Sequence, residues 1–129
     1  MPFVLTTSDR VMFARIYGVF TVAELEQLAT EAEAAEAEHP VSVDRITDIT
    51  GVERFEVGIR EIYYFAIRRS AQKFSRVVKS AIVVEDSEQF RQASLYAALS
   101  ENPQIQIRIL QKAAGAREWF AQASAESIQ

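Results

Sequence analysis

Residues 80–89 read SAIVVEDSEQ, and this short stretch decides how the chain folds. Its first half, Ala81 to Val84, is apolar on both faces, which is typical of a strand at the centre of a parallel sheet. Its second half begins a helix, because Asp86 or Ser87 can cap a helix with a side-chain oxygen. A central strand that passes directly into a helix predicts a sheet in which strands and helices alternate.

The same alternation extends along the rest of the chain. Asp9-Arg10 is predicted to turn the chain between two antiparallel strands, Thr21 and Glu24 form a capping box, and Gly51 is expected to end a strand in a turn. The order β-β-α-β-α-β-α-β-α predicts an α/β fold with an open mixed sheet, mostly parallel, whose first strand is antiparallel. We expect strands at residues 3–8, 11–20, 44–50, 77–85 and 104–109, and helices at 21–38, 57–74, 86–102 and 114–123.

Length and composition fit one globular domain, residues 1–129 with a core at about 3–121. The chain has 129 residues, 49% of them hydrophobic and 25% charged. It has no cysteine, which excludes thiolate metal sites and cysteine nucleophiles. Its one histidine, His39, precedes a proline, and a single histidine excludes multi-histidine metal sites. No glycine-rich phosphate loop follows a strand. We therefore expect no metal, no cofactor and no enzymatic activity.

The net charge and the hydropathy of the chain argue against two kinds of partner, nucleic acid and the membrane interior. The net charge of −4 opposes binding to nucleic acid, which needs a basic surface. No apolar run reaches the roughly 18 residues of a membrane span, so no integral membrane association is expected. The first residues do not resemble a signal peptide, and a cytoplasmic location is expected.

Periodicity also predicts which helix faces are buried. In residues 21–38 the inward face carries Leu25, Leu28, Ala29, Ala32 and Ala35. In residues 57–74 the inward stripe is Ile59, Ile62, Tyr63, Ala66, Ser70 and Phe74. In the last helix Ala116, Trp119, Phe120 and Ala123 turn inward, and the Trp119 indole N–H is expected to donate a hydrogen bond.

Three stretches carry a resemblance to a known family: residues 44–52 (DRITDITGV), 80–84 (SAIVV) and 116–120 (AREWF). In that order they resemble a strand end, the central strand and the closing Ala-x-x-Trp-Leu segment of the SpoIIAA-like family of small bacterial domains, also described as STAS or SEC14-like. The resemblance covers nearly the whole chain, residues 3–121, and implies the same fold.

One stretch departs from that family. Anti-sigma-factor antagonists of the group carry a phosphorylatable serine after this strand, whereas the corresponding segment here, Phe55 to Ile59, has Val57 and no hydroxyl. The nearby Thr50 precedes the expected site. The resemblance therefore implies the fold without the phosphorylation switch.

Oxygen-bearing side chains follow two neighbouring strands. Because ligands of open α/β sheets bind beyond the carboxyl ends of strands, this edge is a candidate ligand or partner site. Alternatively, Asp86 only caps a helix and Asp48 only binds backbone N–H groups of the next turn. The candidates at this edge are Asp48, Thr50, Gly51, Glu85 and Asp86.

Charge is segregated between two helices. Residues 24–38 carry six glutamates and no base, whereas Arg68, Arg69 and Lys73 belong to a basic run that extends from residue 60 to residue 79. The basic residues are candidates for an anionic headgroup, an acidic partner or the acidic helix of a second subunit. Alternatively, they only complement the dipole of their own helix.

Four apolar side chains are predicted to lie away from the buried stripes of their helices. These candidates for self-association are Tyr64, Phe65, Leu95 and Leu99, the last two lying away from a face that contains Phe90, Ala93 and Ala97. We interpret the chain as a non-catalytic interaction or regulatory module that binds a protein partner or itself as a homodimer. The alternative is a carrier of a small apolar or lipid-like ligand, as the SEC14-like label implies, with an apolar pocket under the helices and the basic helix end at the ligand's headgroup.

Overall fold

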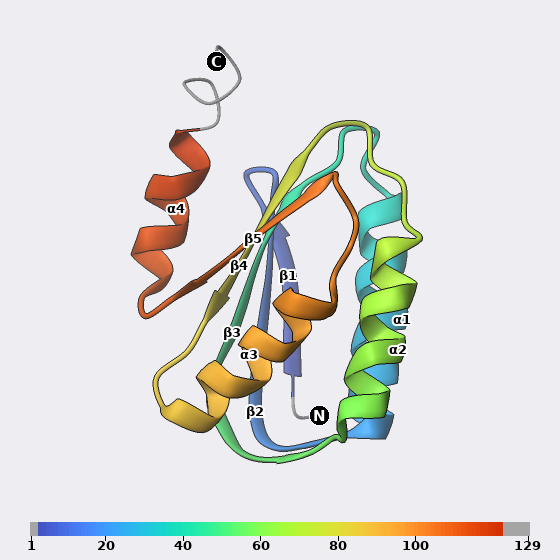
Figure 1. Cartoon of the computed structure of the whole chain (residues 1–129). Coiled ribbons are helices and arrows are strands. Elements are labelled where there is room, and N and C mark those ends of the chain that lie inside the picture. The colour runs from blue at the N-terminus through green and yellow to red at the C-terminus, as the bar shows by residue number, and fades with distance from the viewer. Residues whose placement is uncertain (1–2, 123–129) are drawn as a thin grey trace.

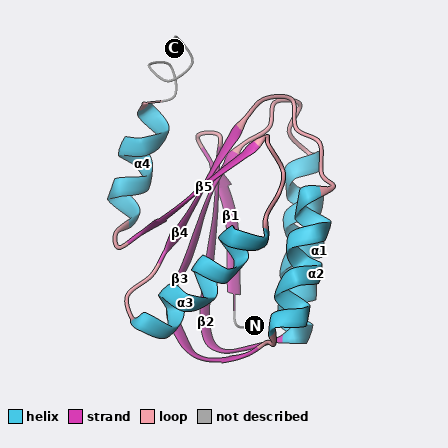
Figure 2. Cartoon of the chain, in the orientation of Figure 1, coloured by secondary structure: helices cyan, strands magenta, loops and turns pink. Residues whose placement is uncertain are grey.

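The computed structural model describes residues 3–122, which form five strands and four helices in the predicted order (Figures 1 and 2). The strands are β1 (Phe3–Ser8), β2 (Val11–Thr21), β3 (Asp44–Glu56), β4 (Val78–Val83) and β5 (Ile105–Leu110). The helices are α1 (Val22–Ala37), α2 (Ile59–Ser70), α3 (Ser87–Leu99) and α4 (Ala113–Ala121). Ala123, predicted in the last helix, lies outside the described residues.

The strands form one sheet in the order β1-β2-β3-β4-β5. β1 runs antiparallel to β2, and β2 to β5 are mutually parallel, which confirms the predicted mixed sheet. The hairpin between β1 and β2 turns at Asp9 and Arg10, whose φ angles of 52° and 64° are positive. Two positive φ angles in a two-residue loop match the right-handed twist of the flanking strands.

Three helices cover one face of the sheet and α4 lies on the other (Figure 1). Each of the three β-α-β connections advances to the next strand in the same direction, so connections of the usual right hand place α1, α2 and α3 together. The larger apolar cluster lies beneath these three helices, and a smaller one, containing Ile46, Val83 and Trp119, lies under α4.

The predicted helix starts at α1 and α3 are confirmed by their caps. Thr21 accepts the backbone N–H of Glu24, and the Glu24 carboxylate accepts the backbone N–H of Thr21. Asp86 and Gln89 make the same reciprocal pair at α3. These local signals need no tertiary context, because each is complete within four residues.

β3 is longer than predicted, because Gly51 does not end it. The strand continues to Glu56, with two register shifts in its pairing with β2. A Cβ atom on Gly51 would lie 2.9 Å from the Tyr17 Cβ atom, so glycine permits a close approach of two strands here. The residue that was expected to make a turn instead relieves crowding inside the sheet.

The predicted buried stripe of α2 is wrong in part. Ile62 and Ala66 are buried, but Ile59 and Tyr63 are exposed, and the helix ends at Ser70 before Phe74. Residues 62–67 are all apolar, so periodicity alone does not fix which face is buried. The buried face of α2 is determined by its contacts with α1 on one side and α3 on the other.

Candidate functional site

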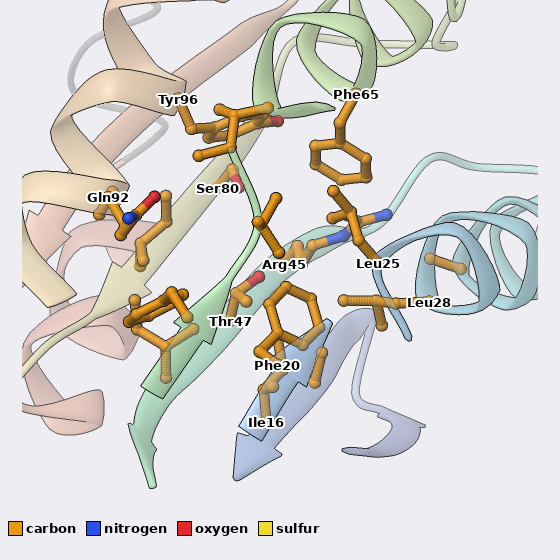
Figure 3. Close-up of a pocket in the computed structure, with 18 residues that line it drawn as sticks. Ile16, Phe20, Leu25, Leu28, Arg45, Thr47, Phe65, Ser80, Gln92 and Tyr96 are labelled. Carbon is orange, nitrogen blue, oxygen red and sulfur yellow. The ribbon is translucent and has the colours of Figure 1, made fainter. Parts of the chain in front are cut away.

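A cavity of about 110 Å³ lies between the sheet and the three helices that cover it (Figure 3). Apolar side chains make most of its wall, from β2 (Ile16, Phe20), α1 (Leu25, Leu28), α2 (Ile62, Phe65) and α3 (Ala93). Five polar residues also line it: Arg45, Thr47, Ser80, Gln92 and Tyr96. An apolar space with a few polar groups is the usual composition of a small-molecule site.

Strand alternation explains how polar groups reach this cavity. Arg45 and Thr47 are two residues apart on β3, so both face the helices, whereas Ile46 between them belongs to the cluster under α4. Ser80 is the register partner of Arg45 on β4. The middle of the two central strands therefore supplies the polar part of the wall.

Arg45 is the only charged residue among those that line this cavity within the described chain. Its side chain extends from β3 between Phe65 and Leu25 (Figure 3), and the residue is 8% exposed. Its Nη2 atom lies 3.0 Å from Glu36 Oε1 of α1. The same carboxylate oxygen lies 2.9 Å from Nη1 of Arg69, which belongs to α2 and is 3% exposed.

The three buried charges do not cancel, because two guanidinium groups share one carboxylate. The pKa of Arg45 is lowered to about 10, chiefly by burial and also by the charge of Arg69, while Glu36 acts in the opposite direction. Arg45 still carries its charge at neutral pH. The direction of the shift shows that Glu36 compensates that charge incompletely.

Several buried polar atoms have no hydrogen-bond partner among the described residues. Nε of Arg45 and Oε1 of Gln92 belong to residues that line the cavity, and Nε and Nη2 of Arg69 belong to the cluster beside it. Buried polar atoms are nearly always paired in folded proteins, so unpaired atoms beside a cavity indicate where a ligand would be held.

At the carboxyl edge of the sheet, the structure places the predicted oxygen-bearing residues in structural roles. Asp48 Oδ1 accepts the Thr50 backbone N–H at 2.9 Å and its hydroxyl at 2.7 Å, and Asp86 caps α3. Gln89, which was not predicted, donates to the carbonyls of Thr50 and Val52 and accepts the Glu85 backbone N–H.

The Gln89 amide thus bridges the Thr50 carbonyl and the Glu85 backbone N–H, so these residues lie at one edge of the sheet, as expected. Glu85 and Asp86 also border a surface hollow that includes Phe90. Within residues 3–122, no group of three or more potential metal ligands is present. Nor does any helix of that part of the chain have the length and apolarity needed to cross a membrane.

The basic residues of α2 pair within the chain. Arg68 donates to both carboxylate oxygens of Glu33 at 2.6 and 2.7 Å, and Arg69 binds Glu36. The arginines that were candidates for the acidic helix of a second subunit thus bind the acidic helix of their own chain. α1 and α2 lie side by side on one face of the sheet, so their own opposite charges meet first. Lys73 is exposed beyond the end of α2.

Of the four residues predicted to face outward, only Tyr64 does, with 61% exposure. The outward placement of Phe65 is wrong, because its ring stacks 5.4 Å from that of Tyr96 and lines the cavity. Leu95 and Leu99 are also partly buried against the larger cluster, while Phe90, expected inside, is exposed. α3 crosses the sheet so that its Leu95–Leu99 side contacts the core.

Sequence reasoning missed Arg45 and Glu36, although the carrier alternative implied an apolar pocket under the helices. One signal was available: Arg45 stands in the predicted strand at a position that alternates inward with Thr47 and Ile49. A charged residue on the inward face of a strand needs a buried partner or a ligand. Nothing local identified Glu36 as that partner.

No family model matches the chain, and no curated protein matches it. A structure search finds an uncharacterized protein from the DUF3478 family, of Shewanella loihica PV-4, described as having a SpoIIAA-like fold. The two chains are 14% identical and superpose with a TM-score of 0.61 over 91% of this chain and 90% of the other. At that identity the similarity establishes architecture alone. The chain therefore has a SpoIIAA-like fold.

Proposed function

We propose that this domain is a non-catalytic binding module that holds a small, largely apolar molecule in the cavity under α1, α2 and α3. The cavity itself carries this proposal. Leaving about 110 Å³ empty costs roughly 2–3 kcal/mol of stability, by the measured penalty of about 24 cal/mol per Å³. Protein interiors normally fill such space, so an occupant accounts for its retention.

The size of the cavity limits the occupant. An engineered apolar cavity of about 150 Å³ in another protein accepts benzene, which sets the scale for a ligand here. The cavity of about 110 Å³ fits a compact ring or a short chain better than a long-chain lipid. The cavity therefore favours the carrier function that the sequence analysis gave as an alternative, with a ligand smaller than a long-chain lipid.

Replacing Ala93 with Leu is expected to weaken binding of hexanamide, a neutral probe, at least tenfold. Ala93 is buried on the wall of the cavity, so the larger side chain occupies space that the probe needs. Heteronuclear NMR titration measures the affinity. Native mass spectrometry of the wild-type protein purified from cells tests for a bound small molecule.

Ala98→Leu is the matched control, because Ala98 lies on the exposed side of the same helix. This variant is expected to bind hexanamide as the wild type does. If Ala93→Leu also retains wild-type affinity, the cavity is not the binding site and the proposal fails.

A second candidate function, self-association, rests on the outer face of α2. Ile59, Tyr63, Tyr64 and Ile67 are all exposed there, at spacings that place them along one side of the helix. This patch includes Tyr64 from the predicted set and excludes Phe65. Exposed aromatic side chains of this kind are enriched at protein interfaces.

If the patch pairs two copies of the chain, Tyr63→Ser/Tyr64→Ser should convert a dimer to a monomer in sedimentation velocity. Phe90→Ser removes an equally exposed aromatic from α3 and should leave the dimer intact. A wild-type chain that sediments as a monomer at high micromolar concentration excludes this candidate without affecting the ligand proposal.

A further inference from the structure

We propose that the ligand of the cavity is a small carboxylic acid, whose carboxylate binds Arg45 and whose apolar part fills the space between β2 and α3. This inference rests on the binding role proposed above and names the chemical class of ligand. It follows from the charge balance, the unpaired donors and the position of Arg45 in the lining of two spaces.

The charge balance calls for one more negative charge. Arg45 and Arg69 are both at least nine-tenths buried, and the carboxylate they share is Glu36, whose side chain is 11% exposed. The neighbouring pair of Arg68 and Glu33 is already neutral and more exposed. A single monoanion would therefore neutralise the buried cluster, whereas a buried unpaired charge is strongly unfavourable.

The unpaired donors offer that anion a binding geometry. Arg45 Nε has no partner among the described residues, although Nη2 of the same group binds Glu36. A carboxylate oxygen beside Nε would complete the hydrogen bonding of the guanidinium, and such charge-assisted bonds are about twice as strong as neutral ones. Among the neutral polar groups on the wall, the Thr47 hydroxyl lies on the same strand as Arg45, and Ser80 lies opposite Arg45 on β4.

Arg45 also lines two spaces. One is the apolar cavity, and the other is a hollow of about 10 Å³ whose polar lining is Arg45, Arg69, Gln72 and the paired Glu33 and Arg68. The hollow has room for about one water-sized group, which fits a carboxylate oxygen rather than an apolar chain. A phosphate dianion would exceed both this room and the single uncompensated charge.

The test compares straight-chain acids from butanoate to decanoate with their primary amides, by calorimetric titration at neutral pH. Each pair has nearly the same shape and differs in charge. The wild type should bind the best-fitting acid about tenfold or more tightly than its amide. Arg45→Met should lose this preference while it keeps its affinity for the amide.

Arg45→Met is expected to fold, because it leaves Glu36 and Arg69 as a neutral pair and replaces one long side chain by another. Arg45→Lys retains the charge and serves as the second variant, with a partial preference for the acid. Arg54→Gln is the control that should not change the preference, because Arg54 pairs with Glu56 at an exposed part of the same strand and lines neither space.

Equal affinity of the wild type for acid and amide would overturn this inference and leave the ligand-binding role intact. So would a preference that survives in Arg45→Met. Tighter binding of an alkyl phosphate than of the acid with the same chain would overturn the assignment to carboxylates. Failure of both acids and amides to bind would instead remove the ligand-binding role itself.

Discussion

Glu36→Gln is expected to lower the free energy of unfolding by about 3–5 kcal/mol, the usual effect of removing one partner from a buried ion pair. The variant keeps the shape of the side chain and removes only its charge. Arg45 and Arg69, both bound to this carboxylate, would then face each other without a counter-ion. Since Glu36 raises the pKa of Arg45, its loss also makes that charge harder to retain.

Urea denaturation measures the effect, and Glu33→Gln provides the matched control on the same helix. Glu33 also binds an arginine of α2, but its side chain is 33% exposed and that of Arg68 is 42% exposed. Pairs with this exposure contribute about 0–1 kcal/mol. Equal losses in the two variants would show that Glu36 does not hold the buried charges together.

Local signals predicted the fold well because each one is complete in a few residues. The caps at Thr21 and Asp86, the Asp9-Arg10 hairpin and the doubly apolar strand at Ala81 to Val84 depend on neighbours in sequence. Their order then restricts the sheet to a few topologies, because β-α-β connections have one hand. The predicted mixed sheet is confirmed for this reason.

The site could not be predicted in the same way, because its residues lie on three different elements. Glu36, Arg45 and Arg69 each fit a different local interpretation: an acidic helix face, a strand interior and a basic helix end. Only the packing of α1 beside α2 over β3 brings them together. The two charged helices were interpreted as surfaces for partners, whereas in the structure Glu33 and Glu36 of one bind Arg68 and Arg69 of the other.

The same reasoning explains the error at α2. A helix with apolar residues on most of its circumference has no sequence-defined inner face, and neighbouring helices decide which residues become buried. Phe65 packs against Tyr96 of α3, whereas Tyr63 and Tyr64 are exposed. Phe65 was therefore assigned to a self-association surface, although in the structure it lines the cavity.

Trp119→Ala is expected to destabilise the protein by about 3–5 kcal/mol, as is usual for a buried large aromatic side chain. Trp119 is 3% exposed and is the largest side chain of the cluster between the sheet and α4. Its ring lies 5.1 Å from the Lys79 ammonium and 4.8 Å from the Arg108 guanidinium, and both cations face the ring. The substitution would leave a void beside the buried Lys79.

A more conservative substitution separates packing from hydrogen bonding at this position. The expected hydrogen bond of the Trp119 indole N–H is not observed, because the buried Nε1 atom has no acceptor among the described residues. Trp119→Phe therefore loses volume without losing a hydrogen bond and should destabilise the protein less than Trp119→Ala.

Phe120→Ala changes a partly exposed residue next to Trp119, and it should destabilise the protein less than either Trp119 variant. If Trp119→Ala costs less than about 1 kcal/mol in urea denaturation, α4 is not anchored through Trp119. The smaller apolar cluster would then contribute little to holding β3 and β4 in the register that places Arg45 opposite Ser80.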